Sequence, residues 1–286
     1  MKYIDLHVHS TASDGSLKPS ELVNYAAAKN LSAFALTDHD TVDGIDEALK
    51  EAERINYYAD DKVISVIPGI ELSAEYKGRD IHILGLNLDY KNEYFLTQIE
   101  AFRKTRDERN DKMILLLQEH GFNITPELIK KRFGEETVIT RAHYAILMVE
   151  CGYVKDKDAA FSKYLNPGCP CYVPRTKVSV NDAVKLILSA DGKPVLAHPL
   201  LYKLSDNELD SLVKILKENG LLGIEAIYSA NKWNDEARMK ALAVKYGLFI
   251  TGGSDFHGTA KPNLELGTGY GNLRVPEELL KNILSE

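Results

Sequence analysis

Hydrophobic residues recur along the chain in short runs, each bounded by polar residues, glycine or proline. Runs of about four to eight residues, rich in β-branched and aromatic side chains, are typical of buried strands. They predict seven strands, at Tyr3–Val8, Ala33–Leu36, Val63–Ile70, Asp80–Leu86, Pro194–Ala197, Gly223–Ile227 and Leu248–Thr251.

Between most of these strands the spacing of hydrophobic residues changes to the period of an amphipathic helix. The first helix carries Pro19 in its first turn, where no backbone N–H is needed. The predicted helices are Pro19–Lys29, Gly44–Tyr57, Val180–Ser189, Asp206–Glu218 and Asp235–Tyr246. This alternation of strand and helix predicts an α/β fold with a largely parallel sheet.

The alternation is interrupted over residues 91–177. A long, charge-rich helical pattern comes first and three shorter ones follow, at Glu93–His120, Pro126–Arg132, Thr140–Val149 and Asp158–Tyr164. Asn166–Pro174 contains three prolines and one glycine and is therefore predicted to be a returning loop. We expect residues 1–90 and 178–286 to form one domain, with 91–177 as a helical insertion between the fourth and fifth strands.

The composition is that of an ordinary globular protein. The chain has 286 residues, of which 44% are hydrophobic and 27% charged, which excludes a disordered or collagen-like chain. No apolar run approaches the ~20 residues of a membrane-spanning helix. Asp5, His7 and His9 stand where a secretory signal would be apolar, and three cysteines are too few for a disulfide framework. We therefore expect a cytoplasmic protein.

The charge is unevenly distributed. The net charge is −7, but residues 91–177 hold 15 basic and 12 acidic residues, which leaves a net −10 elsewhere. The basic excess of the insertion is either a solvated helical surface or one that attracts anions. It is too small to predict binding to a long nucleic-acid duplex, which usually meets a broader basic surface.

Residues with metal-ligating side chains gather where the predicted strands end. His7 and His9 are two apart on the first strand, so they point to one face. Six strands contribute such residues: His7, His9, Asp14, His39, Glu71, His82, His198, Asp255 and His257. In parallel α/β barrels the loops after the strands meet at one rim, where the chemistry lies. We expect Glu71 to end the third strand and all nine residues to share that rim.

Imidazole and carboxylate groups without thiolate suit Zn, Mn or Fe. Nine such groups exceed the about four to six ligands of one ion, so they predict two or three divalent metal ions with at least one bridging group. Glu71 is the expected bridging carboxylate, with Asp255 as second choice. Asp38 and Asp40 flank His39. We expect one of them, which we assign as Asp38, to orient a metal ligand by contacting it on the side away from the metal.

The chain resembles the PHP (polymerase and histidinol phosphatase) family in seven motifs at both ends of the sequence. They are His7-x-His9, Asp14-Gly15-Ser16, Thr37-Asp38-His39-Asp40, Gly69-Ile70-Glu71, His82, Ala197-His198-Pro199 and Ser254-Asp255-Phe256-His257. The resemblance implies a distorted (β/α)7 TIM-like barrel and a trinuclear metal centre. It implies three ligand sets: His7, His9, Glu71 and Asp255; Glu71, His82 and His198; and Asp14, His39 and His257.

The insertion is similar to that of the branch that includes nucleoside 3′,5′-bisphosphate phosphatases and a related RNA 5′-end exonuclease. In that branch an arginine and a histidine, matching Arg141 and His143, reach over the metals toward substrate phosphate, so the insertion is expected to cover the active site. Lys163, Arg175 or Lys261 could contact a second phosphate, and Tyr172 could stack on a base. For these four side chains, solvation or packing is the alternative interpretation.

These residues together predict a metal-dependent phosphoesterase. Metal ions lower the pKa of bound water to ~7, so hydroxide is the expected nucleophile. Arg141 offers a planar fork for phosphate, and His143 is the expected acid or phosphate binder. The expected substrate is a small nucleotide, most of all the 3′-phosphate of nucleoside 3′,5′-bisphosphates, with short oligonucleotides as a second possibility and no membrane partner.

Three alternatives stay open. A histidinol-phosphate phosphatase would use the same metal motifs but matches the insertion less well. An amidohydrolase-type C–N hydrolase also carries His-x-His on its first strand, although its usual bridging lysine has no counterpart after the third or fourth strand here. A PHP module without activity would be expected to lack some ligands, whereas this chain retains all nine.

Overall fold

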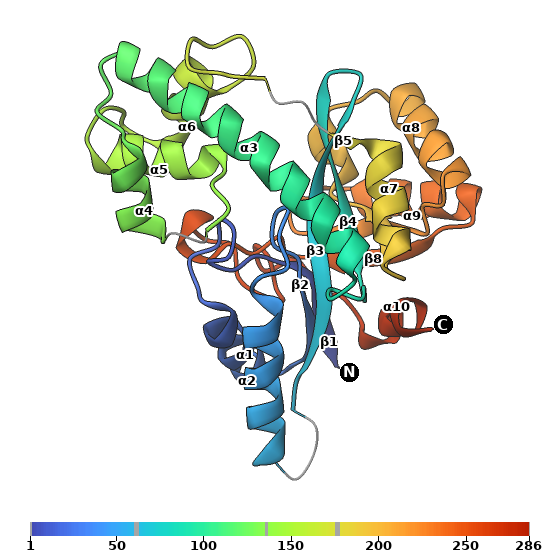
Figure 1. The fold of residues 1–286 in the computed structure, drawn as a ribbon. Coiled ribbons are helices and arrows are strands. Elements are labelled where there is room, and N and C mark those ends of the chain that lie inside the picture. The colour runs from blue at the N-terminus through green and yellow to red at the C-terminus, as the bar shows by residue number, and fades with distance from the viewer. Residues whose placement is uncertain (1, 60–62, 135–136, 175–177, 286) are drawn as a thin grey trace. The chain divides into compact units, whose positions relative to one another are not determined.

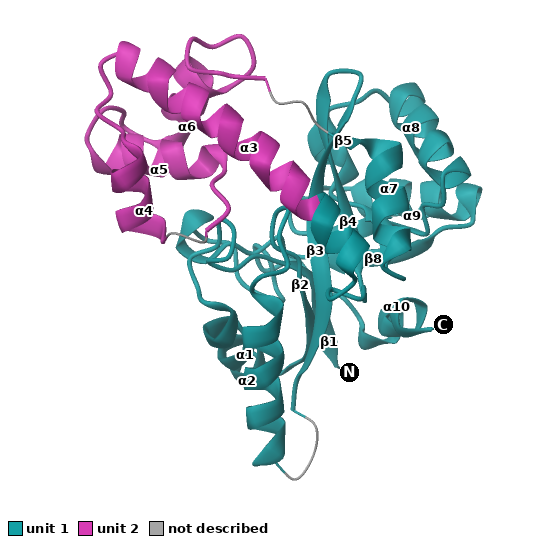
Figure 2. Cartoon of the chain, viewed as in Figure 1, with its two compact units in different colours: residues 1–98, 177–286 teal, residues 99–176 magenta. Residues whose placement is uncertain are grey.

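The computed structural model describes residues 2–59, 63–134, 137–174 and 178–285. These residues belong to two compact units, one made of residues 1–98 and 177–286 and the other of residues 99–176 (Figure 2). The sequence pattern places the first boundary near residue 90, where the insertion begins, whereas the units divide a few residues inside the long helix that follows.

Seven strands of the first unit form a nearly closed barrel in the order β1-β2-β3-β4-β6-β7-β8 (Figure 1). Their bounds are β1 (Tyr3–Val8), β2 (Leu31–Leu36), β3 (Ser65–Tyr76), β4 (Arg79–Leu86), β6 (Lys193–Leu196), β7 (Gly223–Tyr228) and β8 (Phe249–Gly253). The short β5 (Val178–Ser179), which the pattern does not predict, pairs with β3. After β8 the chain closes onto β1, because Asp255 N donates to His7 O at 2.9 Å and His9 N donates to Phe256 O at 2.9 Å.

The helices of this unit begin and end where the sequence supplies caps. They are α1 (Pro19–Ala28), α2 (Ile45–Tyr57), α7 (Val180–Ser189), α8 (Asp206–Glu218), α9 (Asp235–Tyr246) and α10 (Lys281–Leu284). Ser179 accepts the Asp182 N–H ahead of α7, Ser205 and Glu208 form a capping box on α8, and Gly247 ends α9 at a φ of 58°. Across the described ranges, no helix combines the length and the apolar character needed to span a membrane; the cytoplasmic location stays a prediction.

β3 and β4 form an antiparallel hairpin, which corrects the expectation that Glu71 ends the third strand. β3 continues past Glu71 to Tyr76, and Lys77 and Gly78, with φ of 50° and 76°, turn the chain back into β4. β4 therefore runs antiparallel to both β3 and β6, while the other neighbouring pairs along the barrel are parallel. Glu71 lies within β3 and not at its end.

The pairing of β1 with β2 is irregular close to the first two histidines. Between Asp5 and Val8 the pairing of β1 with β2 is irregular, as in a β-bulge. Bulges change the direction in which successive side chains point, and they often occur beside functional sites. Here Leu6 belongs to the apolar cluster of the barrel, whereas the next residue, His7, contacts polar side chains.

The apolar cluster of the barrel collects buried side chains from most of its strands and from the C-terminal segment. Its buried members are Ile4, Leu6, Ala33, Ala35, Ile67, Leu84, Leu86, Val195, Ala197, Ile227, Leu273, Val275 and Ile283. Removing this surface from water is the main stabilising contribution to the strand framework.

The second unit is helical, as the insertion pattern predicts. It contains most of α3 (Glu93–Glu119), then α4 (Pro126–Phe133), α5 (Arg141–Glu150), α6 (Lys157–Ala160) and a π-helical turn, Phe161–Leu165. Its apolar core is its own and includes Met113, Leu117, Phe122, Tyr144 and Cys171.

Candidate metal centre

The structure brings all nine predicted metal ligands together in the first unit. They form overlapping groups in which the ligand atoms lie within 4.8 Å of one another. The nine are His7, His9, Asp14, His39, Glu71, His82, His198, Asp255 and His257. His82 reaches the cluster because β4 runs antiparallel to its neighbours β3 and β6, so that β4 begins where these two strands end.

Glu71 lies at the middle of the cluster with both carboxylate oxygens facing imidazoles. Its Oε1 is 2.8 Å from His82 Nδ1 and 2.9 Å from His198 Nε2. Its Oε2 lies 3.1–3.3 Å from three further ring nitrogens, those of His7, His9 and His39. Burial would raise the pKa of Glu71, but the positive potential of His39, His82 and His7 holds it well below its usual range.

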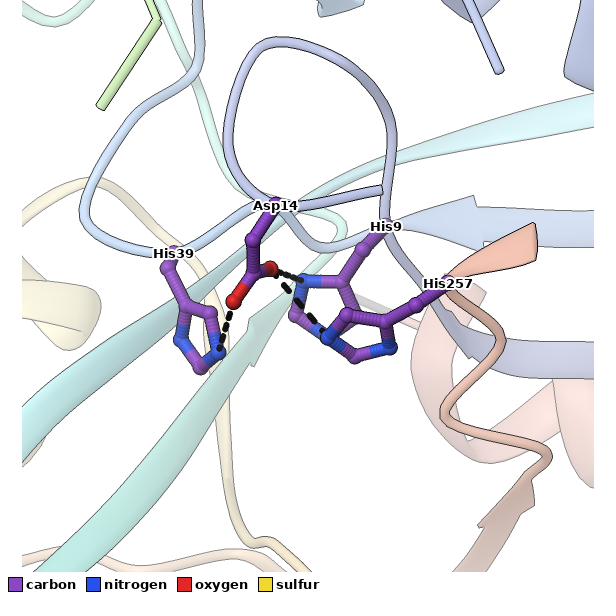
Figure 3. A group of neighbouring side chains, drawn as sticks. All are labelled: His9, Asp14, His39 and His257. Carbon is purple, nitrogen blue, oxygen red and sulfur yellow. Dashed lines mark ion pairs between the residues drawn. The ribbon is translucent and has the colours of Figure 1, made fainter. Parts of the chain in front are cut away.

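A second group surrounds Asp14, between His39 on one side and His9 and His257 on the other (Figure 3). Asp14 Oδ1 lies 3.2 Å from His257 Nε2, and Oδ2 lies 3.9 Å from His39 Nε2. The His9 and His257 rings stack at a centroid distance of 4.1 Å. His9 also faces Glu71 and Asp255 through Nε2, so it joins this group to the first.

Asp255 presents only one oxygen to the imidazoles. Oδ1 lies 3.3 Å from His257 Nδ1 and 3.4 Å from His9 Nε2. Oδ2 accepts hydrogen bonds from Tyr228 Oη at 2.8 Å and Lys261 Nζ at 2.5 Å. Because Glu71 offers both oxygens and Asp255 one, Glu71 is the better placed of the two to bridge metal ions.

Glu225, a buried carboxylate on β7, supports two of the histidines and is not among the residues predicted from the sequence. Its Oε1 lies 3.1 Å from His7 Nδ1, and its Oε2 accepts the His198 backbone N–H at 2.7 Å. A carboxylate that contacts the second ring nitrogen of a metal-binding histidine fixes the orientation of the ring. The only signal in the sequence is an acidic residue inside the apolar run Gly223–Ile227.

Asp38 accepts hydrogen bonds from the loop that follows β1. Its Oδ1 accepts the Ser10 N–H at 2.8 Å and the Ser13 hydroxyl at 2.6 Å, and its Oδ2 accepts the Ser10 hydroxyl at 2.6 Å. The ligand that Asp38 could orient is thus Asp14, at the end of this loop. Asp40 accepts the Ser73 N–H at 2.8 Å and so holds the continuation of β3.

In the second unit, Arg141 and His143 begin α5. The Thr140 N–H donates to His143 Nδ1 at 2.9 Å, and the imidazole is buried edge-on against Phe133. Because Nδ1 accepts, neutral His143 carries its proton on Nε2, which makes Nε2 a donor. Arg141 donates to Leu165 O at 3.4 Å, and its guanidinium lies over the ring of Tyr172.

The other predicted substrate contacts have plainer surroundings. Lys163 is exposed on the π-helical turn, and Tyr172 is partly buried beside Arg141. Lys261 pairs with Asp255. Arg175 lies outside the described residues.

The cluster fits divalent metal ions. Within the described part of the chain, His9 Nδ1, His39 Nδ1, Glu71 Oε2 and His198 Nδ1 are buried and form no hydrogen bond, although Glu71 Oε2 lies 3.1–3.3 Å from ring nitrogens. A buried polar atom left in that state costs about 1–3 kcal/mol, so several in one place need an explanation. Coordination to metal supplies it, since neutral imidazole and carboxylate are the ligands that Zn, Mn and Fe accept.

The chain matches the PHP domain family over residues 5–225. Three curated relatives have nearly equal sequence identity to this chain. A 3′,5′-nucleoside bisphosphate phosphatase from Chromobacterium violaceum is 33% identical over 93% of this chain and 91% of its own length. The 5′-3′ exoribonuclease Rnm of Escherichia coli is 34% identical over 92% and 87%. A phosphoribosyl 1,2-cyclic phosphate 1,2-diphosphodiesterase from Eggerthella lenta is 32% identical over 89% and 94%.

Two solved structures share the whole fold. One is a presumed metal-dependent phosphoesterase from Bifidobacterium adolescentis, with a TM-score of 0.85 and 29% identity over 99% of this chain and 96% of that one. The other is described as an amidohydrolase from Chromobacterium violaceum with bound sulfate and no metal, with a TM-score of 0.86 and 33% identity over 99% and 97%.

Proposed function

The chain belongs to the PHP domain family, and from this premise we propose that it removes the 3′-phosphate from nucleoside 3′,5′-bisphosphates and also acts on short oligonucleotides. Its reaction class is the hydrolysis of phosphoric esters, the class to which all three curated relatives belong by name. The observation that carries the proposal is the convergence of nine imidazole and carboxylate groups around Glu71.

We assign two or three divalent metal ions to the cluster, which the nine side chains would hold and for which Glu71 would be the shared carboxylate ligand. When bound, such ions neutralise phosphate charge and make water more acidic. The protein's own contribution is to hold the ligands: Glu225 fixes His7 and His198, Asp38 fixes the loop of Asp14, and Tyr228 and Lys261 fix Asp255.

Arg141 and His143 are the substrate-binding residues in this proposal. The Arg141 guanidinium can form two parallel hydrogen bonds to phosphate oxygens. His143 Nε2 can donate to a phosphate oxygen or give a proton to the departing ester oxygen, since Nδ1 is held by the Thr140 N–H. Lys163 and Tyr172, in the same unit, are assigned weaker contacts with the rest of the substrate.

We favour nucleoside bisphosphates over other phosphate esters as the substrate. The insertion resembles that of the bisphosphate phosphatase branch, and it carries a small excess of basic residues. Exonucleolytic hydrolysis is the second candidate, favoured by the 34% identity with a 5′-3′ exoribonuclease. Hydrolysis of C–N bonds is the third, kept because of the name of one similar structure. Glu71 weighs against it, since a carboxylate holds the central position where amidohydrolases usually have a modified lysine.

The proposal is tested by measuring phosphate release with Mn²⁺ present. The substrates are adenosine 3′,5′-bisphosphate, 5′-AMP, histidinol phosphate and a 5′-phosphorylated oligonucleotide. We expect release from the bisphosphate and not from 5′-AMP, loss of activity with a chelator, and recovery with Mn²⁺. Preference for histidinol phosphate would contradict the substrate, mononucleotide release would favour the exonuclease, and metal-independent turnover would contradict the mechanism.

A further inference from the structure

A pocket of about 610 Å³ lies next to the metal-ligating cluster, entirely within the first unit. This volume is in the range of small-molecule sites, about 300–1,000 Å³. Its walls come from the loop after β1, from α1 and from the loop after β8, and include Leu17, Tyr25, Phe256, Thr259, Lys261 and Leu264. Neither the predicted ligands nor the insertion line it.

The pocket is lined by residues that follow Asp14 or flank His257 in the sequence. Phe256 stands between Asp255 and His257 in the sequence. The Thr259 N–H donates to the Ser16 hydroxyl at 2.8 Å, which ties the loop after His257 to the loop after Asp14. Lys261 lines the pocket and places its Nζ 2.5 Å from Asp255 Oδ2. The Lys261 side chain therefore connects the pocket with Asp255, a member of the cluster.

The lining suits a flat, uncharged group. The partly exposed ring of Tyr25 packs against the buried Phe256, with ring centroids 5.9 Å apart, so a planar group can stack on Tyr25, and Leu17 and Leu264 add aliphatic surface. Aromatic and aliphatic walls of this kind stack on planar rings. The lining also includes serine, threonine and asparagine, whose side chains can form hydrogen bonds with ring substituents.

The charges of the pocket disfavour a phosphate. Among the described residues that line it, only Lys261 is basic, and its ammonium group is paired with Asp255. Glu21 and Glu265 are acidic, and Glu265 is balanced by Lys29 at 2.9 Å and by the Tyr25 hydroxyl at 2.5 Å. This arrangement argues against the expectation that Lys261 contacts a second phosphate.

We propose that this pocket binds the nucleobase of the substrate while the phosphate lies at the metal-ligating cluster. The inference rests on the proposed function, because it takes the substrate to be a nucleotide. It adds a physical basis for selecting nucleotides over sugar phosphates, since a sugar carries no planar aromatic ring that can stack on the aromatic side chains of the pocket. In this proposal the base stacks on Tyr25 and not on Tyr172.

Two variants test the pocket without changing a predicted ligand. Thr259→Trp fills it from an exposed position, and Tyr25→Leu removes one ring. Tyr57→Leu is the matched control, since Tyr57 is 82% exposed on α2 and does not line the pocket. The substrates are adenosine 3′,5′-bisphosphate and 1,2-dideoxyribose 3,5-bisphosphate, which has the same two phosphates and no base.

We expect both pocket variants to lower kcat/KM for the adenosine compound by roughly tenfold or more, the scale of losing a base stack. We expect kcat/KM for the compound without a base to stay at the wild-type value, and Tyr57→Leu to change neither. Equal losses on both substrates would mean that the pocket only supports the fold. No loss on either substrate would mean that the base lies elsewhere. Both results overturn the proposal.

A binding measurement separates failure of this proposal from failure of the proposed function. Saturation-transfer NMR with the Zn²⁺-loaded protein should show transfer to the adenine H2 and H8 protons of 5′-AMP. Transfer should be lost in Thr259→Trp and retained in Tyr57→Leu. If the wild type hydrolyses no nucleotide but shows this pattern, the proposed function fails and the pocket assignment stands. If the wild type shows no transfer to the adenine protons, the pocket assignment fails whatever the enzyme hydrolyses.

Discussion

The two units of the chain hold their candidate residues in opposite ways. In the barrel unit the candidates come from positions between His7 and His257, and only the pairing of distant strands and loops brings them together around Glu71. In the helical unit Arg141, His143 and Tyr172 come from one short stretch of the chain, residues 141–172, and they contact residues within or beside it, such as Thr140 and Leu165. The barrel site therefore depends on the whole barrel fold, whereas the helical site depends on one helix start and a loop.

The units also have separate apolar cores. The barrel cluster is built on strand residues such as Leu6 and Leu84, and the helical core on Met113, Leu117 and Phe122. Substitutions in the helical unit should therefore leave metal binding intact, while substitutions in the barrel cluster should change it. Metal content is thus the measurement that distinguishes the two kinds of site.

The largest effect is expected for Glu71→Gln. The amide keeps the size of the side chain but removes the charge, and it turns a donor group toward imidazole nitrogens now 2.8–3.3 Å from the carboxylate. We expect bound metal to fall and phosphate release to become undetectable. Added Mn²⁺ should no longer raise the melting temperature, because a ligand stabilises the fold only when it binds the folded state.

Glu75→Gln is the control for this experiment, since Glu75 is an exposed residue on the same strand. It should match the wild type in metal content and activity. A Glu71→Gln protein that keeps its full metal content would show that Glu71 is not a bridging ligand.

A smaller effect with a different pattern is expected for His143→Ala. Loss of a proton donor or phosphate contact should lower kcat/KM by about 10²-fold, at the lower end of what general acid catalysis supplies. Metal content, measured by mass spectrometry of the purified protein, should not change. His120→Ala is the control, because His120 is an exposed histidine of the same helical unit. Unchanged kcat/KM in His143→Ala would remove this residue from the reaction.

His143 also caps α5, so folding has to be checked separately. Loss of its contact with the Thr140 N–H should cost about 1 kcal/mol of stability, as for other helix caps. His143→Asn offers a side-chain oxygen for the same N–H but no imidazole. If it restores the melting temperature without restoring kcat/KM, the two roles of His143 are separated.

Local signals explain why much of the fold could be predicted. The bounds of α7, α8 and α9 follow from Ser179, Ser205 and Gly247, whose effects on the backbone act within a few residues. The antiparallel direction of β4 is not part of the prediction, which has a largely parallel sheet, although the length of the connection before β4 indicates it. The nine residues between the third and fourth predicted strands are too few for the parallel crossover, which needs a dozen or more, and Lys77-Gly78 is suited to a tight turn.

The residue types of the site could also be read from the sequence, but its supporting contacts could not. The nine candidates are recognisable because each has a metal-ligating side chain near a strand end. Glu225 contacts His7 across 218 residues of sequence, and Lys261 acquires its role only by pairing with Asp255. Such contacts depend on which strands become neighbours, and no local pattern encodes that.

The smallest effect in this series is expected for Glu225→Gln, which tests the supporting contacts of the barrel. The amide side chain would keep an oxygen for the His198 N–H but lose the charge opposite His7 Nδ1. Loss of such a partner typically weakens metal affinity by about 10–100-fold. The Mn²⁺ concentration for half-maximal activity should rise by that factor, whereas kcat at saturating Mn²⁺ should return to the wild-type value. Glu218→Gln, an exposed change at the end of α8, should do neither. An unchanged Mn²⁺ requirement would reduce Glu225 to a packing role, and failure to recover at any Mn²⁺ concentration would make Glu225 part of the ligand set itself.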